Sequence, residues 1–194
     1  GELADIHISG SVIEKDFIQW GVEHINEQDS FLEDKRPPFT HCIINPPYKK
    51  FSSDSKYRKW LRQIGIETGN LYSAFLSLAI KLLSNGGELV AIVPRSFCNG
   101  PYFKPFRGLL LKSMAIRHLH VFNTRNQVFK EDEILQENII FHAVKGMQQE
   151  KIIITSSEGP DFEDMTHRTV NFDNVVKPTD KDRFIHISVS EYDQ

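Results

Sequence analysis

Cysteine and long apolar runs are both scarce in this 194-residue sequence. The two cysteines, Cys42 and Cys98, have no C-x-x-C spacing, which excludes a disulfide framework and a structural zinc site and fits a reducing compartment. No apolar run approaches the roughly 20 residues that span a bilayer, and no basic segment precedes an apolar leader. We therefore expect a cytoplasmic protein without a membrane partner. Because the sequence opens with Gly1 rather than Met, we also expect it to be cut from a longer protein.

Charge of one sign dominates each part of the chain, although the net charge is only -3. Residues 1–48 and 126–194 are acidic, whereas residues 49–125 hold 13 basic and 3 acidic groups, a net charge of +10. A basic stretch in a mildly acidic protein is typical of a surface that binds a polyanion, since neutralised phosphates release counterions. A mixed solvated surface is the alternative interpretation.

Apolar segments of strand length alternate with amphipathic helical segments, which predicts an α/β fold with a mainly parallel sheet. The clearest helix covers 70–84, where apolar residues recur at helical spacing before Asn85-Gly86-Gly87 ends the segment. Residues 21–39 are expected to form a loop or a short helix, and residues 157–183 an acidic connection. The other predicted elements are a helix at 102–114 and strands at 5–13, 40–45, 87–94, 115–122, 138–145 and 151–157.

The most informative motif is Asn45-Pro46-Pro47-Tyr48, which follows the apolar end of a predicted strand. Ligands of α/β sheets bind at the carboxyl ends of strands, so the motif lies where chemistry is expected. Two consecutive prolines remove two backbone donors and leave rigid carbonyls that can accept from a ligand. Asn45 adds a side-chain carbonyl acceptor, and Tyr48 adds a flat stacking face. An ordinary Asn-Pro turn is the alternative interpretation.

These groups suit the methylation of an exocyclic aromatic amine. The lone pair of adenine N6 is delocalised into the ring, so the nitrogen is a poor nucleophile until acceptors hold its two hydrogens and let it become tetrahedral. The Asn45 side-chain oxygen and the Pro46 carbonyl are the candidate acceptors. They would place N6 in line with a sulfonium methyl group, so that positioning and electrostatics supply most of the acceleration without a strong general base.

Four further stretches follow the same order and spacing as in a known family: Asp16-Phe17-Ile18-Gln19-Trp20, Asn70-Leu71-Tyr72-x-Ala74-Phe75, Leu82-Leu83-x-x-Gly86-Gly87 and Ile92-Val93-Pro94. Over about residues 5–157 the chain resembles the N6-adenine-specific DNA methyltransferases of bacterial restriction-modification systems, with the NPPY motif and the Taq-type motif order. The resemblance implies a partial Rossmann-like methyltransferase sheet with flanking helices. It also implies S-adenosyl-L-methionine as cofactor, double-stranded DNA as partner, and methyl transfer to N6 of a flipped-out adenine.

The resemblance also implies which residues hold the cofactor. Asp16 contacts the adenosine part of S-adenosyl-L-methionine, Phe17 packs beside it, and Asn45 borders the cofactor site. Because Asp-Phe alone is a weak signal, the interpretation of Asp16 as a strand-end or helix-capping carboxylate stays open.

A base held outside the duplex needs a pocket, and two aromatic faces are a natural clamp. By the resemblance, Phe103, nine residues after the Ile92-Val93-Pro94 stretch, stacks on the flipped base together with Tyr48. The alternative is that Phe103 belongs to the core of the helix predicted at 102–114. In that case Tyr102 or Phe106 faces the base.

The segment after the NPPY motif interleaves basic and aromatic residues, a pattern that favours contact with a phosphate backbone. Its candidates for contact with DNA are Lys49, Lys50, Lys56, Arg58, Lys59 and Arg62. A solvated loop is the alternative. No metal is expected, since the eight histidines lack ligand spacing, and His118 and His120 on one face of a predicted strand favour packing over ligation.

Two parts of the family pattern are not found in the sequence: the glycine-rich turn that holds the methionine part of the cofactor, and the acidic residue that binds its ribose. We therefore interpret residues 1–157 as a partial catalytic domain that lacks its first strands, and residues 158–194 as a connection toward a missing target-recognition domain. This interpretation predicts a further partner, a recognition domain or a restriction endonuclease in the parent protein.

Three other functions stay open: a non-catalytic DNA-binding or specificity module, a glutamine-N5 protein methyltransferase, and an RNA-adenine methyltransferase. The +10 segment favours nucleic acid over protein.

Overall fold

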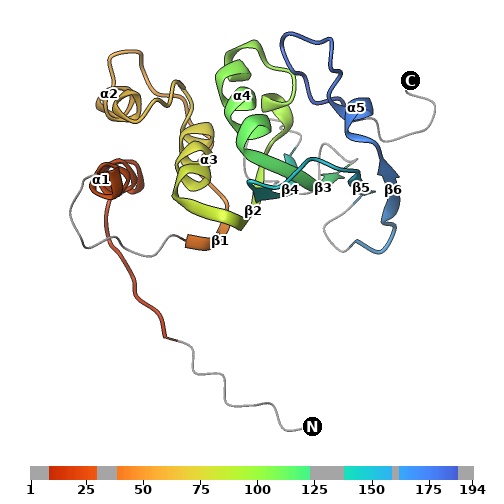
Figure 1. Ribbon diagram of the computed structural model, residues 1–194, viewed down its shortest axis with the longest axis horizontal. Helices are drawn as coiled ribbons and strands as arrows, with labels where there is room; N and C mark the ends of the chain where they lie inside the picture. Colours follow the sequence, from red (N-terminus) through yellow and green to blue (C-terminus); the bar gives the residue numbers. More distant parts are fainter. Residues whose placement is uncertain (1–8, 30–38, 123–137, 159–161, 188–194) are drawn as a thin grey trace, which may run out of the picture.

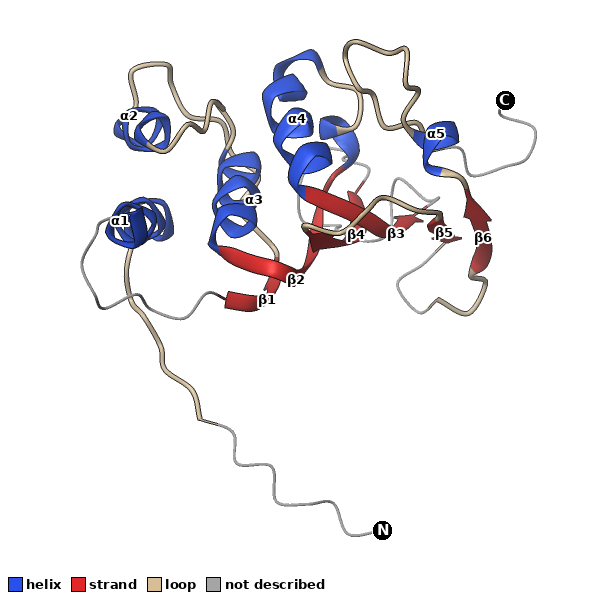
Figure 2. Cartoon of the chain, viewed as in Figure 1, coloured by secondary structure: helices blue, strands red, loops and turns tan. Residues whose placement is uncertain are grey.

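A computed structural model of the chain describes residues 9–29, 39–122, 138–158 and 162–187 (Figures 1 and 2). A six-stranded sheet runs through the molecule, and helices pack on one of its faces. The helices are α1 (Phe17–Asp29), α2 (Lys56–Gln63), α3 (Leu71–Leu82), α4 (Lys104–Ser113) and α5 (Phe172–Val175), with the 3-10 turns η1 (Arg95–Phe97) and η2 (Pro101–Phe103). The strands are β1 (Phe39–Ile44), β2 (Leu83–Pro94), β3 (Met114–Phe122), β4 (Asn138–Lys145), β5 (Ile152–Ser157) and β6 (Thr166–Val170).

The strand order is β1-β2-β4-β3-β5-β6, which confirms the predicted α/β class. The expectation of a mainly parallel sheet is wrong in detail. The β1–β2 and β3–β5 pairs are parallel. The other three pairs are antiparallel, because β4 runs back between β2 and β3 and β6 runs back beside β5. Central strands carry the same continuous apolar pattern in either direction, so the sequence pattern did not distinguish the two arrangements.

The amino-terminal region differs most from the prediction. Of the strand predicted at 5–13, the described residues 9–13 are not in a strand, and the rest lies outside the described residues. Helix α1 begins at Phe17 and covers much of the expected loop or short helix at 21–39. Ile18 and Val22, one turn apart, are buried with Leu61 of α2 and Leu78 of α3, so packing of an apolar stripe forms this helix.

Helix α3 forms as predicted, but it ends at Leu82, and β2 begins at the next residue. The predicted glycine turn lies inside β2, where Gly86 has a φ of +79°. One side of α3, including Leu76 and Ile80, packs with Leu89 of β2 in the main core. Its other side packs against α1 and α2. Burial on both sides makes α3 the central support of the molecule, between α2 and the sheet.

The acidic segment predicted as a connection contributes to the same core. Strand β6 pairs antiparallel with β5 and extends the sheet. Val175, Val176, Ile185 and Ile187 are buried in the main hydrophobic cluster. The expectation that residues 157–183 lead away from the sheet is therefore wrong for β6 and α5. Whether the chain continues toward a recognition domain stays a prediction.

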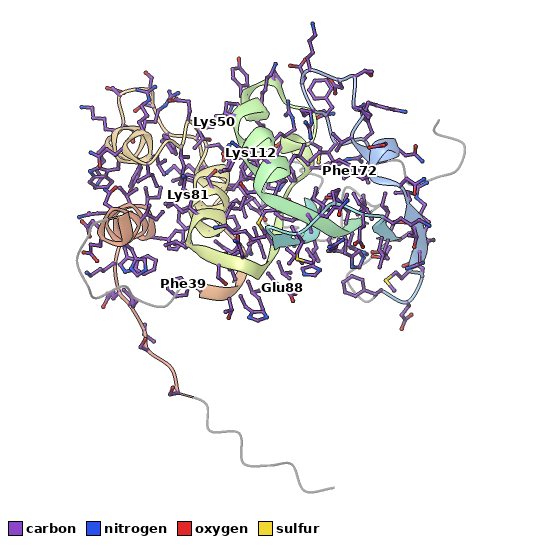
Figure 3. All side chains as sticks on the ribbon, in the orientation of Figure 1. Phe39, Lys50, Lys81, Glu88, Lys112 and Phe172 are labelled. Atoms are coloured by element: carbon purple, nitrogen blue, oxygen red, sulfur yellow. The ribbon has the colours of Figure 1, made fainter. Side chains whose placement is uncertain are left out.

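The sheet face opposite the helices remains open in the part of the chain that the structure describes. Figure 3 shows Phe39 and Glu88 on this side, away from Lys81 and Lys112. Ile43 on β1, the edge strand, is 88% exposed. Among the described helices, none has the length and apolarity needed to cross a membrane. Cys42 and Cys98 are free thiols, the latter buried.

Candidate functional site

The candidate site lies at one edge of the sheet, beyond the carboxyl ends of β1 and β2. These strands are parallel neighbours, so the segments that follow them emerge side by side. The NPPY motif follows Ile44 at the end of β1, and the η1–η2 segment at 95–103 follows Pro94 at the end of β2. The topology therefore brings together two segments that lie about 50 residues apart, as the sequence interpretation requires.

Tyr48 orients the acceptor side chain of Asn45. The Tyr48 hydroxyl lies 3.1 Å from Asn45 Oδ1 and 3.1 Å from the carbonyl oxygen of Ile92 in β2, and it can donate its hydrogen to either. Burial raises the pKa of Tyr48, so the phenol stays protonated at neutral pH and acts as a donor. A carbonyl oxygen has two lone pairs, so Asn45, which is exposed, keeps one for a ligand. Pro46 behind it is buried, which holds the motif against the sheet.

Both predicted stacking residues contact the same aromatic ring, that of Tyr72 in α3. The Tyr48 ring meets Tyr72 edge-on with centroids 6.3 Å apart, and Phe103 stacks on Tyr72 at 5.2 Å with a 27° interplanar angle. Tyr72 is buried, and its hydroxyl lies 3.0 Å from Ser96 Oγ in η1. Tyr72 has no assigned role in the motif pattern of the sequence. Its signal is its place in the third residue of the Asn70-Leu71-Tyr72 stretch.

The alternatives for Phe103 are partly resolved. Phe106 is only 2% exposed and packs against Phe97 in the core, so the interpretation that Phe106 faces a base is wrong. Tyr102 is 88% exposed. Phe103 is half-buried at the border of the main core, next to the site. Its contact with a base stays a prediction.

The end of the NPPY segment is fixed to the start of α3. The backbone N–H of Leu71 donates to the carbonyl of Lys49 at 2.7 Å, and that of Phe51 donates to the carbonyl of Gly69 at 3.0 Å. Asn70 caps α3, because its Oδ1 accepts from the backbone of Tyr72 at 3.2 Å. The same stretch therefore positions the Tyr72 ring and anchors the NPPY motif.

Asp16 caps α1, which is one of the two interpretations left open. Its Oδ1 accepts from the backbone N–H groups of Ile18 at 3.0 Å and Gln19 at 3.1 Å, and its Oδ2 accepts from the Tyr57 hydroxyl of α2 at 2.8 Å. Partial burial alone would raise the pKa of Asp16. The hydrogen bonds from Gln19, Tyr57 and Ile18, with the charge of Lys56, outweigh burial and lower it. The carboxylate is thus ionised and fixed, and its contact with a cofactor stays a prediction.

Phe17 lies beside a small cavity, and its contact with a cofactor stays a prediction. Its ring centroid is 4.8 Å from that of Phe75 on α3 and 6.0 Å from that of Trp20. A cavity of about 270 Å³ is lined by Ser11, Ile13, Lys15, Phe17 and Trp20. Two of these residues, Phe17 and Trp20, are aromatic, and Phe17 directly follows Asp16 in the chain.

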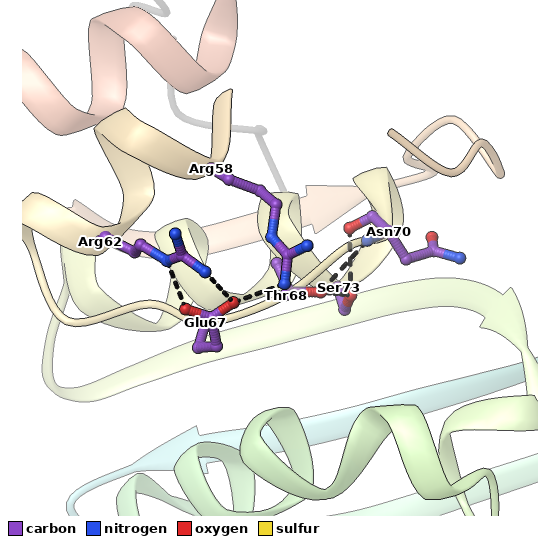
Figure 4. Close-up of polar contacts among 6 residues, drawn as sticks. All are labelled: Arg58, Arg62, Glu67, Thr68, Asn70 and Ser73. Atoms are coloured by element: carbon purple, nitrogen blue, oxygen red, sulfur yellow. Dashed lines mark hydrogen bonds and ion pairs between the residues drawn. The ribbon is translucent and has the colours of Figure 1, made fainter. Parts of the chain in front are cut away.

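The six basic candidates fall into different environments. Arg58 and Arg62 both pair with Glu67 at 2.6 Å (Figure 4), and these hydrogen bonds, that of Arg62 first, lower the pKa of Glu67 to about 2. Lys56 lies over the rings of Tyr57 and Trp60 in α2. The exposed side chains of Lys49, Lys50 and Lys59 form no ion pair or hydrogen bond with the described part of the chain.

Figure 4 also shows the turn that follows Glu67, where Thr68 Oγ1 lies 2.6 Å from Ser73 Oγ. The Arg–Glu cluster thereby adjoins the start of α3.

Away from this site, His118 Nε2 and His120 Nδ1 each form a hydrogen bond with Thr155 Oγ1 at 2.8 Å. Within the described ranges, no group of three His, Cys, Asp or Glu side chains is arranged to hold a metal.

Comparisons with known proteins agree with the resemblance found in the sequence. The chain is 47% identical over 185 residues to Type II methyltransferase M.BsuBI of Bacillus subtilis, covering 95% of this chain and 37% of that protein. It is 44% identical over 191 residues to Type II methyltransferase M.PstI of Providencia stuartii, covering 98% of this chain and 37% of that protein. The chain thus spans little more than a third of the length of these curated relatives.

A solved structure shows the shared fold. A putative class I S-adenosylmethionine-dependent methyltransferase of Listeria monocytogenes superposes with a TM-score of 0.51 at 15% identity, covering 66% of this chain and 39% of that chain. This likeness confirms the predicted Rossmann-like methyltransferase sheet. The model of the family described as Eco57I restriction-modification methylase matches residues 3–129. Because that match spans more than half of the sequence, the chain belongs to the Eco57I restriction-modification methylase family.

Proposed function

We propose that this chain forms the catalytic part of a restriction-modification enzyme that transfers a methyl group from S-adenosyl-L-methionine to N6 of a flipped-out adenine in DNA. One observation carries the proposal: Asn45, an exposed residue, stands at the carboxyl-end edge of the sheet, and the Tyr48 hydroxyl lies 3.1 Å from its amide oxygen and orients it. Family membership and the Type II methyltransferase relatives support methyl transfer as the reaction.

The chemistry follows from the acceptors that the edge presents. The free lone pair of Asn45 Oδ1 and the carbonyl of Pro46 accept the two hydrogens of N6, which draws the nitrogen lone pair out of the aromatic ring. Tyr48 remains neutral and keeps the amide oxygen in place. Preorganised acceptors of this kind act where charge develops in the transition state, so no titrating base is required.

The aromatic surface supports recognition of an unstacked base. Tyr48 and Phe103 both border the Tyr72 ring, so apolar ring surface continues from the β1 end to the β2 end of the site. A base outside the duplex loses its stacking neighbours, and stacking on aromatic side chains restores about 1–3 kcal/mol per base. Lys49 and Lys50, exposed directly after Tyr48, then lie where the backbone of the same nucleotide must pass.

The described residues also fit part of the cofactor. The cavity beside Phe17 and Trp20 has aromatic walls and a neighbouring carboxylate, which suit the planar adenine and the polar groups of an adenosine. When bound, S-adenosyl-L-methionine supplies an electrophilic methyl group on sulfur. This chain would hold the adenosine part of the cofactor at Asp16 and Phe17. Asn45 would hold N6 of the target adenine.

Substitution of Asn45 tests the proposal in the protein as its gene encodes it. Asn45→Ala should abolish methyl transfer while DNA affinity stays within about threefold, since only an interaction that strengthens in the transition state is removed. Asn45→Asp should be less damaging, because a carboxylate still accepts. The matched control is Asn85→Ala, an exposed asparagine near the opposite, amino-terminal end of β2. Equal transfer rates for Asn45→Ala and the wild type would contradict the proposal.

A further inference from the structure

Arg107 is a fully buried arginine that the proposed reaction does not use. It lies on α4 with an exposure of 0%. Its Nη1 donates to two backbone carbonyls of the η1–η2 segment, that of Phe97 at 2.9 Å and that of Gly100 at 2.6 Å. Its Nη2 has no hydrogen-bond partner in the described structure. Removing a guanidinium from water costs free energy, so its burial must be compensated by contacts inside the protein.

The carbonyls that Arg107 holds belong to the turn that presents Phe103. Within this turn the backbone N–H of Phe103 donates to the carbonyl of Gly100 at 3.2 Å. A side chain at Gly100 would place its Cβ 2.9 Å from Cδ2 of the Phe103 ring and 2.6 Å from the carbonyl oxygen of Ser96. One edge of the Phe103 ring therefore lies against the bare Cα of Gly100, and the ring stacks on Tyr72; these two contacts restrict its orientation.

The other side of the guanidinium holds the segment 180–187, a C-terminal strap. Arg107 Nε donates to the carbonyl of Asp182 at 3.0 Å, and the Phe184 ring lies 4.9 Å from its Cζ. The strap is secured twice more, by the ion pair of Lys104 with the Asp182 carboxylate at 2.7 Å and by the backbone N–H of Ile185, which donates to the carbonyl of Cys98 at 2.9 Å. Figure 1 shows the strap as the blue loop that returns from α5 toward α4.

We propose that Arg107 is a positioning residue for the stacking ring: its fork ties the 97–103 turn to the C-terminal strap and thereby sets the plane that Phe103 offers to the flipped base. The inference rests on the proposed function, because it takes Phe103 as the surface on which the adenine stacks. It adds that the alignment of this base depends on residues 180–187, which lie about 80 residues beyond Phe103. Arg suits the role because its planar fork reaches three carbonyls in fixed directions, which a lysine cannot do.

A double-mutant cycle in the protein as its gene encodes it tests this inference. Single-turnover methyl transfer is measured for Arg107→Met and Phe103→Ala, separately and together, with DNA affinity and thermal unfolding recorded for each variant. Arg107→Met should slow transfer by about tenfold with nearly unchanged DNA affinity, and it should have no further effect in the Phe103→Ala background. Arg107→Lys should not restore the rate. Arg117→Met is the matched control, since Arg117 lies on β3 and pairs with Glu150, and this variant should transfer at the wild-type rate.

If Arg107→Met does not fold, Gly100→Ala replaces it in the cycle. Its backbone φ of -65° suits alanine, but the added Cβ would lie 2.6 Å from the backbone carbonyl oxygen of Ser96 and 2.9 Å from the Phe103 ring, so the substitution shifts the turn together with the ring. An effect of Arg107→Met or Gly100→Ala that is equally large with and without Phe103 would overturn the inference and reduce Arg107 to a structural role. That outcome leaves the proposed function intact if Asn45→Ala is still inactive. If the wild-type protein transfers no methyl group to adenine, the proposed function itself fails.

Discussion

The Tyr48 hydroxyl offers a sharp test, because one oxygen atom can be removed while the ring remains. Tyr48→Phe deletes the donor that lies 3.1 Å from both Asn45 Oδ1 and the Ile92 carbonyl, but it keeps the edge contact with Tyr72. A single neutral hydrogen bond is worth about 0.5–1.5 kcal/mol. If that energy orients Asn45 in the transition state, the rate of methyl transfer should fall by about two- to tenfold. The substitution should lower the free energy of unfolding by no more than about 1 kcal/mol.

The assay is single-turnover transfer of a labelled methyl group at saturating DNA and cofactor, with DNA affinity measured in parallel. Tyr48→Phe should bind DNA like the wild type. Tyr48→Ala should transfer more slowly still, because it also loses the stacking surface, worth about 1–3 kcal/mol. A Tyr48→Phe rate equal to that of the wild type would refute the orienting role of the hydroxyl. Equal rates for Tyr48→Phe and Tyr48→Ala would refute the stacking role of the ring.

Four further outcomes are expected. Lys49→Ala with Lys50→Ala should reduce the slope of log affinity for DNA against log salt by about 2 for all sequences, whereas an unchanged slope would place these lysines away from DNA. The transfer rate should be level from about pH 7 to about pH 9 and fall only as Tyr48, whose raised pKa keeps it protonated longer, ionises; a rise through pH 8 would indicate a titrating base. Glu67→Gln should lower the free energy of unfolding by at most about 1 kcal/mol at neutral pH, since the Arg62–Glu67 pair is partly exposed. The pKa of Glu67 is lowered to about 2, so the stability difference between variant and wild type should disappear as the pH falls from about 4.5 to 2. Acid titrations of unfolding measure this difference. The 194-residue chain alone should show no saturable binding of S-adenosyl-L-methionine up to about 1 mM in calorimetry. In sedimentation it should self-associate, because β1 is an edge strand among the described residues and its Ile43 is exposed. Tight binding by a stable monomer would contradict the interpretation of a partial domain.

The sequence predicts the elements around the candidate site better than those at its margins. Strand β1, helix α3 and strand β3 agree with prediction to within about two residues, because apolar residues dominate each segment and recur in α3 at helical spacing. The sequence leaves a loop or a short helix open at 21–39 and does not give the bounds of helix α1, because the buried stripe of α1 depends on α2 and α3. The sequence does not predict strand β6. Its residues, Thr166–Val170, are mostly polar and half exposed, as is common in an edge strand, and such a pattern resembles that of a loop.

Within the site, the sequence identifies the residues of the NPPY motif by their spacing, but it does not predict how their side chains are arranged. The Tyr48–Asn45 hydrogen bond follows once two prolines stiffen the turn, but the role of Tyr72 requires knowledge of which face of α3 meets the sheet. The same limit applies to the basic segment. Its sequence does not distinguish Arg58 and Arg62, which pair with Glu67, from Lys49 and Lys50, which have no such partner, because Glu67 lies beyond the helix that carries the arginines.

The most direct test of the central claim is the identity of the methylated atom. The protein as its gene encodes it is incubated with duplex DNA and S-adenosyl-L-methionine, and the DNA is digested to nucleosides and analysed by mass spectrometry. We expect N6-methyldeoxyadenosine from the wild type and the Asn85→Ala control, and none from Asn45→Ala. Methyl groups on cytosine, on RNA or on a protein glutamine, or equal adenine methylation by Asn45→Ala, would contradict the account.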